Sequence, residues 1–302
     1  FKSLFSNIGK DVVGQQEMME ELMIAMLCNS NALMEGYPGL AKTLAVRTIA
    51  DLMDMSFSRI QHTPDLMPSD ITGTYILDEV NGKRQFKFQK GPIFANIVLA
   101  DEINRATPKT QSALLEAMQE KQVTVGSTTF KLDQPFFVLA TQNPIEQEGT
   151  YPLPEAQADR FLLKIKVGYP TIEEEMKIAD RFTGDHQLPK LNPVVDKKVL
   201  TALQSLSRRV PIANELKRKI IKLIDNTRKK KDLIEFGASP RASIGLIMAA
   251  KARALLKGRT HVSSEDIVKM AFPILRHRLI LNFEAERKGM NTDDVITELL
   301  TK

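Results

Sequence analysis

The sequence has little of several things that would place it in a specialised class. Cys28 is the only cysteine among 302 residues, which excludes an intrachain disulfide, and its apolar neighbours Met26 and Leu27 predict a buried thiol. No run of about 18 apolar residues occurs, as a membrane-spanning helix requires, and the amino end lacks a signal-peptide pattern. We therefore expect no membrane insertion and a cytoplasmic protein.

Patterns for tightly bound metals and for nucleophilic catalysis are also missing. The four histidines are scattered without the spacing of a zinc site, and no nucleophile-elbow sequence of a serine hydrolase occurs. There is no internal repeat and no low-complexity tract. With 43% hydrophobic and 26% charged residues, the composition is that of a soluble globular protein long enough for two domains.

The excess of positive charge raises the question of nucleic acid. The net charge is +5, the pI is near 9.1, and short basic clusters occur at Arg208-Arg209, Lys217 to Lys219, Arg228 to Lys231 and Arg276 to Arg278. Clusters of this kind can neutralise phosphates, but most are solvated faces of helices. Aromatic residues are few in this region, so no stacking platform for single strands is evident. Nucleic-acid contact is the less favoured interpretation.

One short segment carries the clearest chemical signal. It is Gly36-Tyr37-Pro38-Gly39-Leu40-Ala41-Lys42-Thr43, between the apolar run 31–35 and an amphipathic stretch that begins at Leu44. A strand, a glycine-containing loop and a helix in this order form a phosphate cradle, in which Lys42 reaches the β- and γ-phosphates and Thr43 binds Mg²⁺. The general pattern has glycine where this chain has Ala41. The alternative is an ordinary strand-to-helix turn with a surface lysine.

A second candidate site follows the apolar run 96–100, which predicts a buried parallel strand. Asp101 and Glu102 stand at its carboxyl end. We expect Asp101 to hold Mg²⁺, and Glu102, directed the other way by strand alternation, to polarise the water that attacks the γ-phosphate. The alternative is that Asp101 only caps the next helix.

A third apolar run, 135–142, ends in a polar cluster. Pro144 disfavours helix at Asn143, so the chain must leave the strand there. Asn143 could therefore orient the attacking water or contact the γ-phosphate. An Asn-Pro turn in which the side chain bonds its own backbone is an equally good interpretation.

Together these segments resemble the AAA+ ATPases and, within them, the MoxR family. The stretches that carry the resemblance are 36–43, Leu99-Ala-Asp-Glu-Ile-Asn-Arg-Ala106, Thr110-Gln-Ser-Ala-Leu-Leu-Glu-Ala-Met118, Ala140-Thr-Gln-Asn-Pro144, Leu153-Pro-Glu-Ala-Gln157, Asp159-Arg-Phe161 and Ser239-Pro-Arg-Ala242. They span nearly the whole chain in the family's order. Ala41 is shared by that family, so it does not count against the phosphate loop.

The resemblance implies further site residues. Val13 and Gly14, within 12–15, match the family's adenine-contacting stretch, and the nucleotide-binding positions are Gly36, Tyr37, Pro38, Gly39, Leu40, Ala41, Lys42, Thr43 and Leu44. Asn143 matches the sensor-1 residue, Arg241 the sensor-2 arginine, and Arg160 the arginine finger, which stabilises charge on the transferring phosphoryl group from the next subunit. From the residues alone, Arg160 would be assigned to a surface salt bridge with Asp159 or Glu155. Arg105 is the competing candidate for the interface arginine.

The organisation of the chain changes near Gly168-Tyr169-Pro170. Before it, β-branched and apolar runs alternate with helical stretches, as in a parallel sheet covered by helices. After it, the helical period dominates, with marked helix starts at Thr171 and at Ser263 or Ser264. We expect an α/β P-loop domain of the AAA+ type over residues 1–168 and a smaller all-α lid over 169–302.

Two hairpins are predicted as inserts in the first domain. The segment 74–88 alternates around Asn81-Gly82, the strongest short hairpin signal, and 123–130 has a similar pattern around Gly126. Both resemble inserts of this AAA+ branch that can touch the substrate. Each could instead cover a sheet edge or contact a neighbour, and the basic Lys83-Arg84 favours substrate contact for the first.

The sequence thus predicts a Mg²⁺-dependent ATPase that binds ATP. By resemblance it forms a homo-oligomer, expected to be a hexameric ring, and remodels or activates a client protein, with cofactor or metal insertion as one candidate task and a von Willebrand factor A domain protein as one candidate partner. Two alternatives stay open: a nucleic-acid-associated motor, favoured by the basic lid, and a nucleotide-gated scaffold, against which the intact Glu102 argues.

Overall fold

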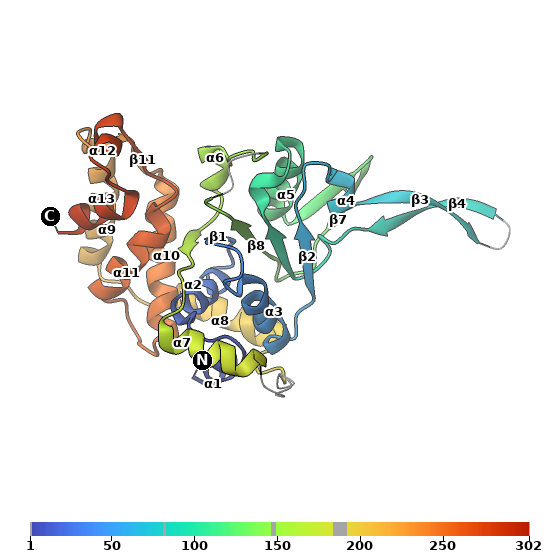
Figure 1. Ribbon diagram of the computed structural model, residues 1–302, viewed down its shortest axis with the longest axis horizontal. Helices are drawn as coiled ribbons and strands as arrows, with labels where there is room; N and C mark the ends of the chain where they lie inside the picture. Colours follow the sequence, from blue (N-terminus) through green and yellow to red (C-terminus); the bar gives the residue numbers. More distant parts are fainter. Residues whose placement is uncertain (1, 81–82, 146–148, 184–191, 302) are drawn as a thin grey trace. The chain divides into compact units, whose positions relative to one another are not determined.

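The computed structural model describes residues 2–80, 83–145, 149–183 and 192–301. Its central feature is a five-stranded parallel sheet in the order β2-β5-β8-β1-β9 (Figure 1). The strands are β1 (Ala32–Glu35), β2 (Phe57–Gln61), β5 (Ile97–Asp101), β8 (Phe137–Gln142) and β9 (Leu163–Lys166). The predicted fold class, a parallel sheet flanked by helices with a helical lid, is confirmed.

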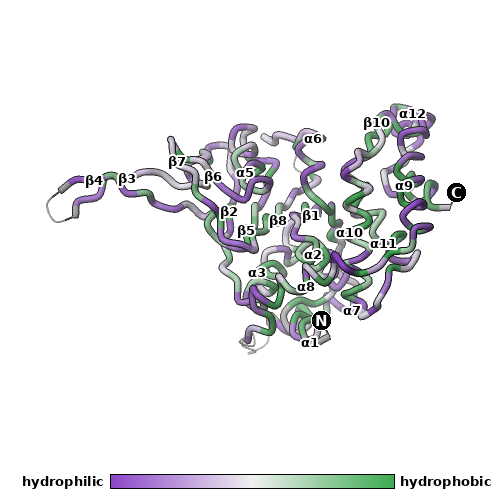
Figure 2. The backbone as a smooth tube through the Cα atoms, turned by 180° about the vertical axis from the view of Figure 1, so that it is seen from behind, coloured by the Kyte–Doolittle hydropathy of each residue, from purple (hydrophilic) through white to green (hydrophobic). Residues whose placement is uncertain are grey.

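The central strands are the apolar runs that the sequence marks. Every residue of β5 is buried, as are the first five of β8, and Figure 2 colours these strands mostly green, for hydrophobic. Strands covered on both faces take such continuous apolar sequences. From β1 the chain crosses to β2 at one edge and returns through β5 and β8. This reversal of strand order places a binding crevice at the carboxyl end of β1.

Two compact units divide the chain. The first comprises 1–16, 33–153 and 167–197, and the second comprises 17–32, 154–166 and 198–302. The domain boundary predicted near residue 168 stays a prediction. Helices assigned wholly or mainly to the first unit are α1 (Lys2–Asp11), α3 (Lys42–Leu52), α4 (Pro68–Thr72), the 3-10 turn η1 (Ile103–Arg105), α5 (Pro108–Glu120) and α7 (Ile172–Thr183).

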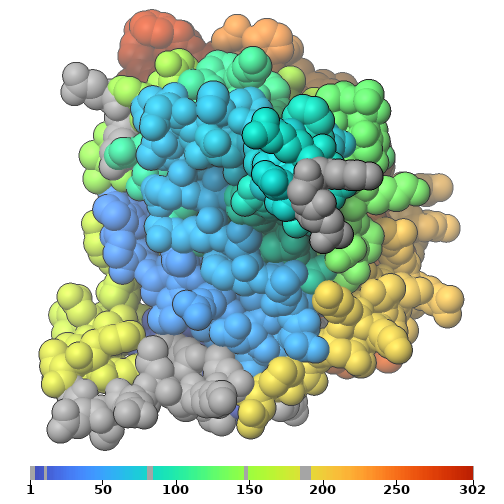
Figure 3. Space-filling model, turned by 90° about the vertical axis from the view of Figure 1, so that its right-hand side faces the viewer, coloured from blue at the N-terminus to red at the C-terminus, as the bar shows by residue number. Residues whose placement is uncertain are grey.

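The two predicted hairpins are present in the first unit. They are β3–β4 (Gly73–Val80 and Lys83–Lys90) and β6–β7 (Gln122–Val125 and Thr128–Lys131). Figure 1 shows β3–β4 projecting from the rest of its unit, and Figure 3 views it, in teal, nearly end-on. The Asn81-Gly82 turn lies outside the described residues.

The hairpins contact each other. The rings of Phe88 and Phe130 stack with centroids 4.2 Å apart, and the Tyr75 hydroxyl lies 3.3 Å from Thr128 Oγ1. Offset stacking of this kind adds to the stability gained by burying the rings. The shorter hairpin therefore supports the base of the longer one. Whether either hairpin touches a substrate stays a prediction.

The second unit is mainly helical. Its elements are α2 (Gln16–Leu27), α6 (Glu155–Ala158), the edge strand β9, α8 (Lys197–Arg209), α9 (Asn214–Lys229), β10 (Ile234–Phe236), α10 (Pro240–Leu256), α11 (Ser264–Leu275), β11 (Ile280–Leu281), α12 (Phe283–Arg287) and α13 (Thr292–Leu300). The helix start at Ser263 is confirmed, because its side chain and that of Asp266 form a capping box. The start at Thr171, which lies in the first unit, is confirmed in the same way by its bonds with Glu174.

Cys28 is buried, as predicted, and burial raises the pKa of its thiol to about 12. None of the helices in the described ranges combines the length and apolar character needed to span a membrane.

Candidate nucleotide and metal site

The loop between β1 and α3 has a shape that needs small residues and unusual backbone angles. Ala41 has a left-handed conformation (φ 57°) directly before Lys42, and Gly39 has φ +82°. A Cβ added to Gly36 would lie 2.7 Å from the carbonyl oxygen of Val167, so only glycine fits there. The loop therefore wraps tightly around the amino end of α3, where free N–H groups favour an anion.

Lys42 lies inside this loop. Its Nζ donates a hydrogen bond to the carbonyl oxygen of Gly36. Burial lowers the pKa of Lys42, while the nearby carboxylates Asp101 and Glu102 act in the opposite direction. The lysine is thus a partly desolvated cation beside two acids. Its positive charge would attract an anionic ligand strongly because few water molecules screen it.

A polar cavity of about 340 Å³ opens in front of the loop. The structure brings five of the predicted site residues to it: Lys42, Thr43, Asp101, Glu102 and Asn143. Arg59 and Thr141, which the sequence analysis did not single out, complete the polar lining together with the loop residues Pro38 to Ala41 and Leu44. Residues separated by about a hundred positions therefore meet at one edge of the sheet.

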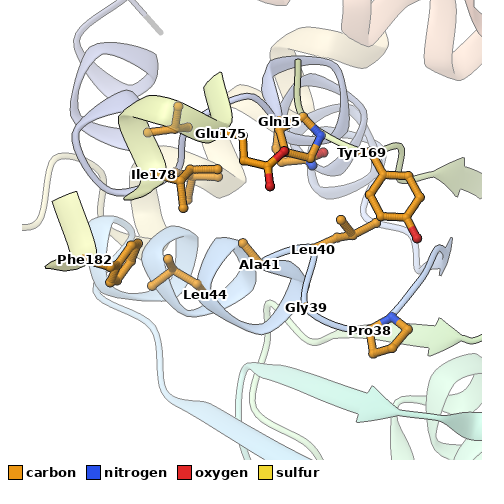
Figure 4. A pocket seen from close by; sticks show the side chains of 13 residues that line it. Gln15, Pro38, Gly39, Leu40, Ala41, Leu44, Tyr169, Glu175, Ile178 and Phe182 are labelled. Atoms are coloured by element: carbon orange, nitrogen blue, oxygen red, sulfur yellow. The ribbon is translucent and has the colours of Figure 1, made fainter. Parts of the chain in front are cut away.

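A more apolar cavity of about 500 Å³ shares the loop with the polar one. Figure 4 shows Ile178 and Phe182 of α7 directed toward Leu44, with Tyr169 above Leu40. The predicted contact residue Val13 lines this cavity too, with Val12 and Gln15. An apolar cavity joined to a polar one matches the two halves of a nucleotide, its base and its phosphates.

Gly14 stands beside this cavity rather than in its lining. Its φ is +75°, and an added Cβ would approach the Glu174 side chain to 2.9 Å. Gln15 donates from Nε2 to the carbonyl oxygen of Gly168 at 3.1 Å. The segment 12–15 therefore lies close to Glu174 at the start of α7, and one hydrogen bond links it to Gly168.

Asp101 is held by donors on both of its oxygens. Arg59 donates to Oδ2 from Nη2 (2.6 Å) and from Nε (3.0 Å), and the Thr141 hydroxyl donates to Oδ1 at 2.5 Å. The cap bond of the alternative interpretation is not formed, since Glu102 occupies the cap position of the 3-10 turn. Asp101 thus faces the polar cavity in a fixed orientation.

Glu102 reaches the cavity by a route that differs from the prediction. Strand alternation does not direct it, because β5 ends at Asp101 and Glu102 takes a left-handed conformation (φ 55°). Its backbone N–H donates to Thr141 Oγ1 at 2.9 Å, and its Oε2 accepts from Gln61 Nε2 at 2.8 Å. This turn lets both carboxylates line one cavity, where alternation would have separated them.

The interface candidate Arg105 is paired with this acid inside the chain. Its Nε lies 3.2 Å from Glu102 Oε2.

Asn143 forms the turn of the alternative interpretation and also lines the polar cavity. Its Oδ1 accepts a hydrogen bond from the backbone N–H of Ile145 at 3.2 Å, which is the Asn-Pro turn of the alternative interpretation. The residue also lines the polar cavity while being only 7% exposed. The turn therefore fixes the side chain without removing it from the site.

The two remaining predicted arginines, Arg160 and Arg241, belong to the second unit. Arg160 is exposed, and neither Asp159 nor Glu155, both within the described ranges, forms the salt bridge considered as its alternative. Arg241 Nη1 lies 3.3 Å from Asp159 Oδ2. Their roles toward a nucleotide stay predictions.

One basic cluster is not the solvated helix face that its sequence suggested. Arg278 is 9% exposed, and its Nε donates to Asp159 Oδ1 at 2.6 Å. The neighbouring Arg276 pairs with Asp293, and burial holds the pKa of His277 well below its usual range. Arg276 and Arg278 are therefore engaged by carboxylates of the same chain.

The site residues not predicted from the sequence are Arg59, Gln61 and Thr141 in the polar network, and Tyr169, Glu175, Ile178 and Phe182 in the apolar cavity. A signal for the first two exists: Arg59 and Gln61 alternate along β2, whose end meets the end of β5 at Asp101. The α7 residues carry no local signal, since they lie far along the chain from the loop.

Hard oxygen donors of the kind that Mg²⁺ prefers are present. The hydroxyl of Thr43 and the carboxylate of Asp101 line the same cavity. Among the described residues there is no group of three or more His, Cys, Asp or Glu side chains that could hold a metal alone. The residues therefore fit an ion that takes its other ligands from phosphates and water, as Mg²⁺ does in nucleotide sites.

Comparisons with known proteins agree with this geometry. The family described as "ATPase family associated with various cellular activities (AAA)" matches residues 31–163, and "AAA lid domain" matches 227–299. A solved structure of a candidate ATPase from Cytophaga hutchinsonii is 46% identical, covers 100% of this chain and 93% of its own, and superposes with a TM-score of 0.92. The fold and the loop are those of a P-loop protein of the AAA type.

Relatives that match more than nine tenths of this chain identify the family within the AAA proteins. "Chaperone MoxR1" of Mycobacterium tuberculosis is 44% identical over 96% of this chain and 78% of its own length, and "Protein MoxR" of Paracoccus denitrificans is 28% identical over 92% of this chain and 88% of its own. The chain belongs to the MoxR family of AAA+ ATPases.

Proposed function

We propose that this protein hydrolyses ATP in a Mg²⁺-dependent reaction. The observation that carries the proposal is the meeting of Lys42, Thr43, Asp101 and Glu102 around one cavity beside a phosphate-type loop. The adjoining apolar cavity supports a nucleotide over a free phosphate, since it offers a place for a base. Family membership supports the same activity.

Each residue has a task that its position supports. The loop N–H groups and Lys42 bind the phosphates, and Thr43 and Asp101 would hold Mg²⁺. The ion, when bound, neutralises charge on the phosphates during transfer. Glu102 accepts the proton of the attacking water. The amide NH₂ of Asn143, whose Oδ1 is used in the turn, orients that water or the γ-phosphate.

A shared active site is part of the proposal. Arg160 is exposed and lacks an ion pair with its adjacent acids, which supports a role on another molecule. An arginine that serves the nucleotide of the next subunit requires a head-to-tail interface that closes into a ring, for which we propose a hexamer. Light scattering with and without Mg·ATPγS measures whether nucleotide promotes this assembly.

The proposed use of hydrolysis is the remodelling or activation of a client protein. The projecting β3–β4 hairpin supports this, because Leu77 and Phe86 pair across its strands and are 57% and 77% exposed. Exposed apolar side chains of this kind are typical of protein contact sites. The name of one relative, "Chaperone MoxR1", points the same way. A nucleic-acid motor has less support, since Arg276 and Arg278 are engaged in ion pairs within the chain.

Replacing the loop lysine tests the proposal. Lys42→Ala should abolish ATP binding, because it removes the cation that the loop holds against the phosphates. Calorimetric titration with ATPγS and Mg²⁺ measures this. Lys219→Ala, which removes an exposed lysine of α9, is the charge-matched control and should bind as the wild type does. Equal binding by the Lys42→Ala variant would overturn the assignment of the site.

A further inference from the structure

Arg59 has a position that the proposed reaction does not explain. It lies on β2 in the middle of the strand, and its guanidinium reaches Asp101 at the end of β5. Both of its hydrogen bonds to Asp101 go to the same oxygen, Oδ2, and Thr141 donates to the other oxygen. The carboxylate assigned to the metal is therefore already engaged by a cation that belongs to the chain.

The position of Arg59 is unfavourable for a metal ion bound to Asp101. Each carboxylate oxygen accepts about two hydrogen bonds, so the two N–H groups of Arg59 fill Oδ2. A guanidinium keeps its charge at any ordinary pH, which means that a divalent cation on Asp101 would also face a like charge nearby. Arg59 in its present position therefore weakens the binding of a metal ion to Asp101.

Arg59 is also free to leave. Its side chain is 48% exposed, in contrast to 12% for that of Asp101, so it can turn to solvent without opening a cavity in the core. Its Nη2 bonds Gln61 Oε1 at 2.6 Å as well, and Gln61 in turn bonds Glu102. Movement of Arg59 would therefore change the hydrogen bonds of both Asp101 and Glu102.

We propose that Arg59 is a tethered counter-ion of Asp101 that holds this carboxylate in place without metal and competes with Mg²⁺ for it. It is a positioning residue, since it acts through Asp101. The inference rests on the proposed function. Arg59 then lowers the affinity of Asp101 for the metal ion, and it keeps the carboxylate oriented between turnovers.

The metal dependence of nucleotide binding tests this inference without measuring turnover. The affinity for ATPγS is titrated by calorimetry at a series of free Mg²⁺ concentrations. Arg59→Gln should reach its half-maximal metal effect at about two- to fivefold lower free Mg²⁺, the range expected for losing a half-exposed ion pair. Arg59→Lys, which keeps a charge with fewer donors, should fall between. Arg209→Gln removes an exposed charge in α8 and should match the wild type.

The outcomes separate the inference from the proposed function. A wild-type protein that binds no ATPγS would overturn both, whereas ATPγS binding that does not depend on Mg²⁺ would overturn the inference alone. A normal wild-type dependence that Arg59→Gln leaves unchanged, or shifts to higher Mg²⁺, would overturn the inference alone. So would weaker ATPγS binding by Arg59→Gln at saturating Mg²⁺, because Arg59 would then serve the phosphates. Tyrosine fluorescence checks that each variant is folded, since all four tyrosines lie in the first unit.

Discussion

Charged side chains have different surroundings in the two units. In the first, Asp101 and Glu102 line a cavity, and their partners Arg59 and Arg105 have side chains 48% and 38% exposed. In the second, Asp266 is 0% exposed and bonds Arg253, whose side chain is 6% exposed. An open network can exchange partners with a ligand, whereas a closed one cannot. The partners of Asp101 and Glu102 are thus open to solvent, whereas Asp266 and Arg253 are closed off from it.

Backbone strain follows the same division. Among the described non-glycine residues, four of the five with positive φ lie in the first unit: Ala41, Asp54, Glu102 and Lys121. Two of these, Ala41 and Glu102, line the polar cavity. Left-handed conformations are unfavourable for residues with a side chain and tend to gather at functional sites.

The largest effect on stability is expected in the closed network of the second unit. Asp266 accepts from Arg253 Nη1 at 2.7 Å and from Arg259, and Ser263 donates to it as well. Burial opposes its charge, but these donors outweigh burial and lower the pKa of Asp266. Asp266→Asn removes the buried carboxylate that Arg253 and Arg259 share. Arg253 keeps its ion pairs with Glu20 and Glu265, but two neighbouring guanidinium groups lose their common anion, so the free energy of unfolding should fall by about 3–5 kcal/mol.

Urea unfolding followed by far-ultraviolet circular dichroism measures that loss. Asp225→Asn removes an exposed partner of Lys229 on α9 and should cost no more than about 0.5 kcal/mol. Tyrosine fluorescence follows the first unit separately. If Asp266→Asn abolished ATPγS binding in molecules that are still folded, the network would not be purely structural and the comparison would fail.

A pH-dependent effect of similar size is expected at Glu21 of α2. Burial raises its pKa from 4.5 to about 8, with Arg276 acting in the opposite direction. The folded state therefore holds the proton more tightly than the unfolded chain does. Stability should fall as the pH rises from about 4.5 to about 8, by on the order of 4 kcal/mol. Glu21→Gln should remove this fall, as urea unfolding across the range would measure. An unchanged slope would show that Glu21 ionises freely in the fold.

Local patterns were enough to predict much of the site. The apolar runs became β1, β5 and β8, and the glycine-containing segment became the loop before α3. Lys42, Thr43, Asp101, Glu102 and Asn143 share a cavity because the carboxyl ends of neighbouring parallel strands meet at one edge. That consequence follows from topology, which the alternation of strands and helices indicates.

What escaped prediction depends on pairing between distant segments. Arg59 reaches Asp101 only because β2 is the neighbour of β5, with Gln61 opposite Asp101. The sequence of neither strand indicates that the two are adjacent in the sheet. The conformation of Glu102 depends on where β5 ends, which strand periodicity does not specify to one residue. The α7 lining depends on the chain returning to the loop after more than a hundred residues.

The most direct test of the account is the Glu102→Gln variant, with binding and turnover measured on the same sample. The change keeps the side chain's shape and removes the carboxylate that accepts the proton of water. We predict ATPγS affinity within about twofold of the wild type and phosphate release slower by a factor of about 10² or more. Wild-type phosphate release by this variant would contradict the claim that the polar cavity of the first unit is the site of ATP hydrolysis.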